Sequence, residues 1–271
     1  MIQEVGIRLL ALDVDDTLLP QGGVISHENL SAINSARDAG VYVAIATGRG
    51  YLGATPICKT LDIKGPVIVF GGAKIIDTRT GECLFNAQMP PDLVREALDT
   101  AAELGIYAHI FEGDGIVCER AHPYSDAYIR GQNLPRRLDP LIRRKLWRHV
   151  PKVLAITEPE KTPGYIRLFQ ERFEGRLKIS GSRPGFVEIN RLDAHKGSAL
   201  MRIAEMMGLN REQVAAVGDN SLDLEMIRWA GLGAAVADAE PEALAAADIV
   251  VPPCALNGVA WFIERYILAK A

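Results

Sequence analysis

The chain has 271 residues, of which 48% are hydrophobic and 24% are charged, and its net charge at pH 7 is −4. This balance is typical of a globular protein, and the lack of a basic surplus argues against a nucleic-acid-binding protein. No segment approaches the ~18 uninterrupted apolar residues of a membrane span. The first residues lack a signal-peptide pattern, so we expect a cytoplasmic protein that contacts no membrane.

Four cysteines are scattered along the chain, at Cys58, Cys83, Cys118 and Cys254. No two of them have the spacing of a metal site or of a redox motif. We therefore expect buried free thiols in a reducing compartment.

The N-terminal segment combines a short apolar run with a cluster of acids. Residues 9–12 are apolar and predict a strand that is buried on both faces, as central parallel strands are. Asp13, Asp15 and Asp16 follow directly, and a charge that leaves water is costly unless it is paired or binds a metal. A helix N-cap is the alternative, but the proline and glycines of residues 20–23 indicate a loop. Because ligands of open α/β sheets bind at the carboxyl ends of strands, these acids predict a site.

The next segments alternate between helix and strand patterns. Ser26 is a candidate N-cap for a helix that Gly40 terminates. Residues 41–46 and 66–70 predict buried strands, with a short helical stretch between them. This alternation predicts a parallel sheet with right-handed crossovers.

The pattern changes between residues 82 and 190. A helix is predicted over residues 90–104, and a hairpin follows, with strands over residues 107–111 and 115–118 and a turn over residues 112–114. Further strands are predicted over residues 153–157, 176–180 and 186–189. We interpret residues 82–190 as a separate α/β module that is inserted into the first one.

The alternation of helix and strand patterns seen before residue 82 resumes at Lys196. A helix is predicted over residues 197–207, and a strand over residues 214–217 ends in the run Gly-Asp-Asn-Ser. The remaining elements are a helix through residue 229, a strand over 232–236, a helix over 241–246, a strand over 248–251 and a helix over 258–269. The predicted fold is therefore α/β, with a doubly wound, mostly parallel, Rossmann-like core over residues 1–81 and 191–271.

Polar groups stand at the ends of these strands and at one helix start: Asp13 with Asp15, Thr47, Lys196, and Asp219 with Asp223. Taken singly, each has an ordinary structural explanation as a turn, a solvated side chain or a helix cap. Together, and at one edge of one sheet, they predict a functional site.

The order and spacing of these residues resemble the haloacid dehalogenase superfamily of phosphohydrolases. D-V-D-D-T at residues 13–17 matches the first motif of that family, D-x-D-x-T, and T-G-R at residues 47–49 is similar to the second. Lys196 in H-K-G-S-A-L is similar to the third motif, and G-D-N-S-L-D at residues 218–223 to the fourth. The insert, which ends in F-V-E-I-N, resembles the larger α/β cap of the Cof-type branch. The resemblance covers the whole chain and implies hydrolysis of a small phosphorylated metabolite.

The resemblance also implies a nucleophile and a metal site. Asp13 would attack phosphorus and form an aspartyl phosphate. Mg²⁺ would be held by Asp13, Asp219 and the backbone carbonyl of Asp15. Asp223 would hold a metal-bound water or Lys196.

Further roles follow from the same resemblance. Asp15 would act as general acid on the leaving alcohol and as general base on water, so it would have to be protonated near neutral pH. Thr47 and the amide of Gly48 would bind phosphate oxygens. Lys196 would neutralise these oxygens and Asp13.

Two positions depart from the family pattern. Leu222 stands where the fourth motif usually has Asn, and Gly71 stands where an Asn usually follows the third strand. Asn220 is a candidate substitute for the first. Because a charge-assisted hydrogen bond is worth ~1.5–3 kcal/mol, the departures predict slower turnover rather than its loss, and they leave the substrate open.

Substrate contacts are expected from the core and from the insert, which would close over the site as lids do. Arg49 would grip the substrate or pair with a structural carboxylate, and Asn220 is a second candidate. His195 is interpreted as a neighbour of the helix cap. Candidates in the insert, each of which could equally face solvent, are Glu119, Arg120, His122, Tyr124 and Arg183.

We predict a Mg²⁺-dependent phosphatase of a small phosphorylated metabolite such as a sugar phosphate, acting as a monomer or homodimer. One alternative is a non-catalytic or weakly active phosphometabolite-binding protein, which the two departures favour and the retained acid pair opposes. Another is phosphoryl transfer to a different acceptor, as in mutases of this superfamily. A receiver-like signalling domain is disfavoured, because the chain is too long for one and the insert separates Thr47 from Lys196.

Overall fold

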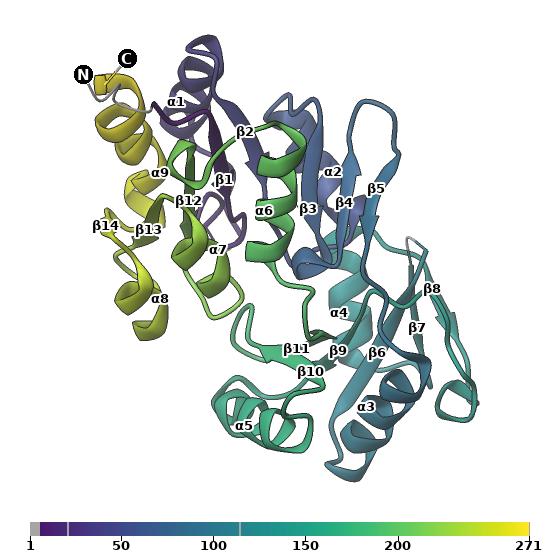
Figure 1. The fold of residues 1–271 in the computed structure, drawn as a ribbon. Helices are drawn as coiled ribbons and strands as arrows, with labels where there is room; N and C mark the ends of the chain where they lie inside the picture. Colours follow the sequence, from purple (N-terminus) through teal and green to yellow (C-terminus); the bar gives the residue numbers. More distant parts are fainter. Residues whose placement is uncertain (1–5, 21, 114, 271) are drawn as a thin grey trace.

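The computed structural model describes residues 6–20, 22–113 and 115–270 of the chain. It has two α/β parts, a core and a cap, and the chain leaves the core for the cap and later returns (Figure 1). The predicted α/β fold with an inserted second module is therefore confirmed. No helix in the described part of the chain is long and apolar enough to cross a membrane.

The core is built on a five-stranded parallel sheet with the strand order β14-β13-β12-β1-β2. Strand β1 is an interior strand of this sheet, between β12 and β2. All four of its residues are buried, as its apolar sequence predicts. The strands span Leu9–Leu12 (β1), Tyr42–Ile45 (β2), Val214–Gly218 (β12), Leu232–Val236 (β13) and Ile249–Val251 (β14).

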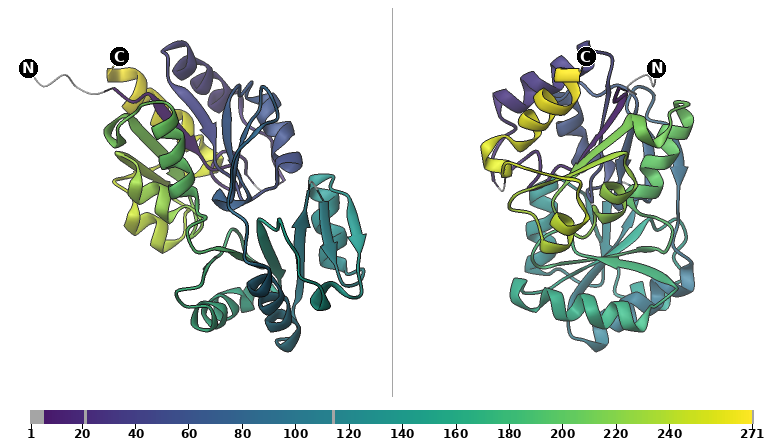
Figure 2. Two further views of the ribbon diagram at one scale, coloured as in Figure 1. Left: turned by 45° about the vertical axis from the view of Figure 1, so that its right-hand side comes forward. Right: turned by 60° about the vertical axis from the view of Figure 1, so that its left-hand side comes forward.

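Helices cover both faces of this sheet (Figure 2). Helices α1, α2 and α9 pack on one face, α6 and α7 pack on the other, and α8 packs against α7 and β13. Ser26 caps α1 as predicted, because its hydroxyl accepts the N–H of Asn29 at 3.1 Å, and Gly40 follows the helix at a φ of 83°. The helices span His27–Asp38 (α1), Tyr51–Thr60 (α2), Lys196–Met206 (α6), Leu224–Trp229 (α7), Pro241–Ala246 (α8) and Gly258–Phe262 (α9).

Strand β3 (Pro66–Val69) joins the core sheet through a single parallel bridge between Ala46 and Ile68. It pairs with β4 (Lys74–Asp77), which pairs with β5 (Cys83–Asn86), and both pairings are antiparallel. Neither β4 nor β5 was predicted from the sequence, and the predicted domain boundary at residue 82 falls between these two strands. We propose that the core continues to residue 86, because β5 pairs with a core strand.

The cap contains a six-stranded sheet with the order β10-β11-β9-β6-β7-β8. Helices α3 and α5 pack on the face away from the core, whereas α4 lies between the cap sheet and the core (Figure 1). The helices span Pro91–Glu103 (α3), Pro123–Gln132 (α4) and Thr162–Arg172 (α5). The strands span Tyr107–Glu112 (β6), Gly115–Cys118 (β7), Arg136–Leu138 (β8), Lys152–Ile156 (β9), Leu177–Ser180 (β10) and Phe186–Arg191 (β11).

The predicted hairpin of the cap is confirmed as β6 and β7, although Glu112 belongs to the strand rather than to the turn, and Asp114 lies outside the described residues. Helices α4 and α5 are missed by the sequence analysis, because few of their residues are buried and their apolar pattern is weak. All four cysteines are free, but the expectation that all are buried is wrong, since Cys83 is exposed.

Candidate active site

The register of the parallel strands brings the predicted residues together. Leu12 of β1 lies opposite Val217 of β12 and Ile45 of β2. The residues that follow these three positions therefore leave the sheet at the same edge. Asp13 and Thr47 come from two of these strand ends, and Asp219 comes from the third.

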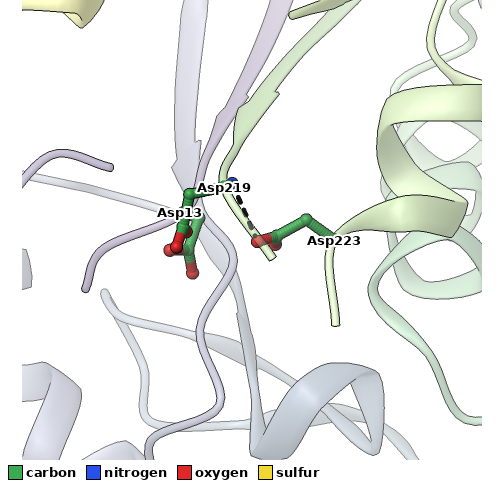
Figure 3. A group of neighbouring side chains, drawn as sticks. All are labelled: Asp13, Asp219 and Asp223. Atoms are coloured by element: carbon green, nitrogen blue, oxygen red, sulfur yellow. Dashed lines mark hydrogen bonds between the residues drawn. The ribbon is translucent and has the colours of Figure 1, made fainter. Parts of the chain in front are cut away.

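Three carboxylates meet at this edge of the sheet. One oxygen each of Asp13, Asp219 and Asp223 lies within 4.8 Å of the other two (Figure 3). The backbone N–H of Asp219 donates to Asp223 Oδ2 at 3.2 Å, and the Thr17 hydroxyl donates to Asp219 Oδ1 at 2.8 Å. These bonds fix the direction in which two of the carboxylates point. Thr17 lies inside the first motif, so its position there is the signal that could have identified it.

Lys196 places one ammonium group against this cluster. Its side chain is 1% exposed, and its Nζ contacts Asp13 Oδ1 and lies 2.5 Å from Asp223 Oδ1. Burial lowers the pKa of Lys196, but the two carboxylates outweigh burial and raise it above its usual range. Lys196 is therefore charged, and of the two predicted roles of Asp223, contact with Lys196 is observed.

Two features position the N-terminus of α6: its cap and its close approach to Gly72. His195 is the N-cap residue, and its Nδ1 accepts the N–H of Ser198 at 3.1 Å, so His195 forms the helix cap itself rather than lying next to it. Gly72 has a φ of 102°, and a Cβ there would lie 2.2 Å from the carbonyl carbon of His195. Only glycine permits this approach, which brings Lys196 to the carboxylates.

The cluster carries three carboxylates for one ammonium, which is an excess of negative charge in a buried place. Burial and then the charge of Asp223 raise the pKa of Asp13 to about 7, and burial raises the pKa of Asp219 well above its usual value. Asp13 Oδ2 is buried and has no hydrogen-bond partner among the described residues. Clustered carboxylate oxygens with an unpartnered oxygen fit a hard divalent cation such as Mg²⁺.

Asp15 does not contribute its side chain to this cluster. Its carboxylate accepts two hydrogen bonds from Arg49, at 2.9 Å from Nε and 2.6 Å from Nη2. Burial raises the pKa of Asp15, but the hydrogen bond and the charge of Arg49 outweigh burial and lower the pKa. The expectation of a protonated Asp15 near neutral pH is therefore wrong for this arrangement. Of the two predictions for Arg49, the ion pair with a carboxylate is observed.

Thr47 and Gly48 occupy the loop that follows β2. Thr47 is fully buried, and its hydroxyl oxygen accepts the N–H of Arg49 at 3.1 Å. Its backbone N–H donates to the Ile68 carbonyl at 2.9 Å, and its carbonyl accepts the N–H of Gly71 at 3.0 Å. The loop is therefore fixed on both sides of Thr47.

A cavity of about 80 Å³ lies above these residues, between the core and the cap. Its core lining includes Asp13, Asp15, Arg49 and Lys196. Its cap lining comes from α4, from the segment that leads into β11 and from β11 itself, through Ala127, Tyr128, Gly131, Gln132, Ser182, Arg183, Phe186 and Glu188. The core therefore forms one side of the site cavity, and the cap covers the other side.

Comparison with known proteins agrees with this architecture. The sequence model of a family described as haloacid dehalogenase-like hydrolases matches residues 10–263. The chain belongs to this family. Its predicted membership of the haloacid dehalogenase superfamily is confirmed.

Relatives of this haloacid dehalogenase-like hydrolase match almost its full length. The 5-amino-6-(5-phospho-D-ribitylamino)uracil phosphatase YcsE of Bacillus subtilis is 29% identical over 98% of this chain and 98% of its own. The pyridoxal phosphate phosphatase YbhA of Escherichia coli is 28% identical over 96% of this chain and 99% of its own. A solved haloacid dehalogenase-like hydrolase of Bacteroides thetaiotaomicron has a TM-score of 0.81 and 26% identity, and the match covers 96% of this chain and 99% of that one. The predicted enzyme class, a hydrolase of phosphate monoesters, is confirmed.

The two departures from the pattern of this hydrolase family lie next to each other. Leu222 is buried, and a Cβ at Gly71 would lie 3.2 Å from Leu222 Cδ1. A Cβ at Gly48 would lie equally close to Leu222 Cδ2. The leucine therefore fills space beside both glycines, and an apolar contact replaces the two amides that the family pattern predicts.

The predicted substrate contacts fall in different places. Arg183 lines the site cavity, whereas Glu119, Arg120 and His122 line a separate cavity of about 410 Å³ elsewhere in the cap. Tyr124 lines neither of these two cavities. Of these candidates, each of which was predicted either to contact the substrate or to face solvent, Arg183 is therefore the one that lines the site cavity.

Asn220 lines the site cavity but is held by neighbouring groups. Its Nδ2 donates to the Ser182 carbonyl at 3.0 Å and lies 3.2 Å from both oxygens of Asp219. Three cap residues that were not predicted from the sequence form hydrogen bonds with one another or with the core: Lys152, Ser182 and Glu188. Glu188 belongs to the F-V-E-I-N run, so that run held a signal for one of them.

Proposed function

We propose that this chain is a Mg²⁺-dependent phosphatase that hydrolyses a small phosphorylated metabolite through an aspartyl phosphate on Asp13. The observation that carries the proposal is the position of Asp13 and Lys196 on the floor of a cavity that the cap closes. A carboxylate nucleophile beside a fixed ammonium group is suited to attack on a phosphate, whose negative charge must be offset.

The metal would be held by carboxylate oxygens of Asp13 and Asp219, by the backbone carbonyl of Asp15 and, directly or through water, by Asp223. When bound, Mg²⁺ would offset the charge of the phosphate and of the acidic cluster. The unpartnered Asp13 Oδ2 supports this assignment, because a buried carboxylate oxygen requires a partner.

The first step forms a bond between an oxygen of Asp13 and phosphorus and breaks the bond between phosphorus and the leaving oxygen, which receives a proton from Asp15. In the second step a water oxygen attacks the same phosphorus, Asp15 takes a proton from this water, and the bond between phosphorus and Asp13 breaks. Asp13 is thereby regenerated, and the products are an alcohol and inorganic phosphate. Lys196, the Thr47 hydroxyl and the Gly48 N–H would bind phosphate oxygens.

The ion pair between Asp15 and Arg49 adds a requirement to this reaction. A carboxylate that accepts two bonds from a guanidinium is held in its ionised form. Arg49 must therefore release Asp15 before Asp15 can donate a proton. Because both residues line the cavity, we infer that a substrate oxygen competes for Arg49 and frees Asp15.

The size and lining of the cavity support a small substrate. Its volume is about 80 Å³. It is lined by charged core residues and by four cap residues, Tyr128, Gln132, Arg183 and Phe186. The phosphatases YcsE and YbhA are named for small phosphorylated compounds. We infer that the substrate of this chain is also a small phosphate monoester, whose leaving group faces the cap.

The test is phosphate release from a panel of phosphorylated sugars, polyols, acids, cofactors and nucleotides, measured with Mg²⁺ and with a chelator. We expect release that requires Mg²⁺ and that falls by about three orders of magnitude or more in Asp13→Asn. Asp38→Asn is the matched control, because Asp38 is an exposed carboxylate at the end of α1, and we expect phosphate release equal to that of the wild type.

Release that survives in Asp13→Asn would exclude the proposed nucleophile. Release that persists in the chelator would exclude the proposed metal. If no member of the panel is hydrolysed while inorganic phosphate still binds, the phosphometabolite-binding alternative replaces the enzyme. The contact of Leu222 with Gly71 would then be the feature to revert first.

A further inference from the structure

We propose that Lys152 of the cap is a positioning residue for Thr47, and that it acts through the peptide bond between Gly48 and Arg49. This inference rests on the proposed phosphatase reaction, in which the Thr47 hydroxyl binds a phosphate oxygen. It adds that the cap orients a phosphate-binding group of the core.

Lys152 is a buried cation whose partners lie on both sides of the boundary between cap and core. Its side chain is 1% exposed. Its Nζ donates to Glu188 Oε2 within the cap, at 2.6 Å, and to the Gly48 carbonyl of the core, also at 2.6 Å. A buried ammonium needs such partners, because an unpaired one is very costly. The Gly48 carbonyl is therefore the core partner of this buried ammonium group, and Glu188 is its partner within the cap.

Strand pairing explains why this cation faces the core. Lys152 of β9 lies opposite Asn190 of β11, and Glu188 stands two residues before Asn190. Side chains two positions apart on a strand share a face, so all three project from the same face of the cap sheet. Asn190 Nδ2 donates to the Phe70 carbonyl of the core at 2.9 Å, which shows that this face meets the core.

The peptide bond that Lys152 holds is the one that also contacts the Thr47 hydroxyl. In a trans peptide the C=O and the N–H lie in one plane and point in opposite directions. The C=O of this plane belongs to Gly48 and accepts from Lys152, and the N–H belongs to Arg49 and donates to Thr47 Oγ1 at 3.1 Å. Rotation of this plane would break both bonds. Lys152 therefore keeps the Arg49 N–H pointed at the hydroxyl oxygen.

This arrangement decides what the Thr47 hydroxyl can do. A hydroxyl has one proton to donate and two lone pairs that accept. With one lone pair occupied by the Arg49 N–H, the hydroxyl proton is directed away from that donor. Thr47 is buried, and its backbone forms hydrogen bonds with Ile68 and Gly71. Its side chain is therefore held in place by the backbone on both sides. The fixed hydroxyl is then ready to donate to a phosphate oxygen.

The same network continues to the acidic cluster. Glu188 Oε1 accepts from the Ser182 hydroxyl at 2.6 Å, and the Ser182 carbonyl accepts from Asn220 Nδ2 at 3.0 Å. Asn220 lies beside Asp219. Docking of the cap therefore completes one set of bonds from the Thr47 loop to the metal-binding end, and undocking would release both.

The test is a double-mutant cycle on kcat and KM, with the best substrate of the panel. The variants are Lys152→Met, Thr47→Val and the double variant. We expect each single variant to lower kcat by roughly ten- to a hundredfold, since each removes one charged or phosphate-directed hydrogen bond. We expect the double variant to resemble the single Thr47→Val variant, because Lys152 acts through the hydroxyl that is already missing.

Lys178→Met is the matched control. Lys178 is also a cap lysine that pairs with the core, through Glu225 of α7, but it does not contact the Thr47 loop. We expect its kcat to stay within about twofold of the wild type, because a partly exposed ion pair contributes little. A loss equal to that of Lys152→Met would reduce Lys152 to an ordinary docking contact and overturn the proposal.

Other outcomes separate this proposal from the proposed function. If the losses of kcat multiply in the double variant, Lys152 does not act through Thr47 and the proposal is wrong. If the wild type releases no phosphate, the proposed function fails, and the same cycle is measured on the binding of inorganic phosphate by calorimetry, with the same expected lack of additivity. If Lys152→Met does not fold, Lys152→Met with Glu188→Gln removes both buried charges and takes its place in the cycle.

Discussion

The core side and the cap side of the site hold their residues by different means. Asp13, Thr47 and Asp219 of the core follow strand ends, where register alone brings them to one edge of the sheet. On the cap side, Lys152 and Glu188 project from the face of a sheet and reach the site because that face docks on the core. The proposed catalytic residues are therefore positioned by the topology of one sheet, whereas the proposed substrate contacts would depend on the packing of the cap sheet against the core.

The largest expected effect comes from the core cation. Lys196→Met leaves Asp13 and Asp223 buried with no positive partner. We expect the free energy of unfolding in a chelator to fall by about 3–5 kcal/mol and kcat to fall by about three orders of magnitude. Urea unfolding with and without Mg²⁺ measures the first effect, and added Mg²⁺ should restore part of the stability. An unchanged unfolding curve would mean that the cluster is neutral without the lysine.

The second effect concerns pH and again tests the core. The pKa of Asp13 rises from 3.8 to about 7 on folding, so between these values the native state binds a proton that the unfolded state lacks. Stability from this group is present below the lower value and is lost as the pH rises through the upper one. In a chelator, Asp13→Asn should therefore gain stability relative to the wild type, by roughly a few kcal/mol as the pH increases from about 4 to 8. Urea unfolding across this range checks it, and a difference that does not change with pH would contradict it.

The third effect compares two cap arginines. Arg183 lines the site cavity, whereas Arg120 lines the separate cap cavity. We expect Arg183→Gln to raise KM by about tenfold, as the loss of one charged contact to the substrate should, and Arg120→Gln to leave KM unchanged. Steady-state kinetics on the best substrate measure both. Equal effects of the two variants would show that the cap does not contact the substrate through the residues of the site cavity.

The smallest effect tests the contact between the two departures from the family pattern. Gly71 has a φ of 65°, which asparagine accepts, but its new Cβ would crowd Leu222. Gly71→Asn alone should therefore destabilise the protein, and Leu222→Asn in the same chain should relieve the crowding. We expect a favourable coupling of about 0.5–1 kcal/mol in a double-mutant cycle of unfolding free energies. Additive losses would show that the two positions are independent.

Site residues could be predicted from the sequence where a local signal and the topology agree. The apolar run of β1 followed by Asp13, and the later run of β12 followed by Asp219, could each be located from the chain, and parallel pairing requires that their ends meet. The state of Asp15 was predicted less well, because no local sequence pattern indicates that Arg49 forms an ion pair with it. Prediction was weakest for the cap candidates, which were chosen for residue type in a stretch without apolar periodicity.

What the sequence by itself determined is the family, the α/β class, the inserted module and the acidic residues with Lys196, since each depends on residues that are close in the chain or on strand ends. Only the tertiary structure decided which cap residues reach the site, how Arg49 and Asp15 pair, and that Lys152 bonds to the Gly48 carbonyl 104 positions away. The physical reason is that these contacts form between the surfaces of two separate sheets. The way the whole cap docks on the core decides which residues meet. No short sequence pattern predicts that docking.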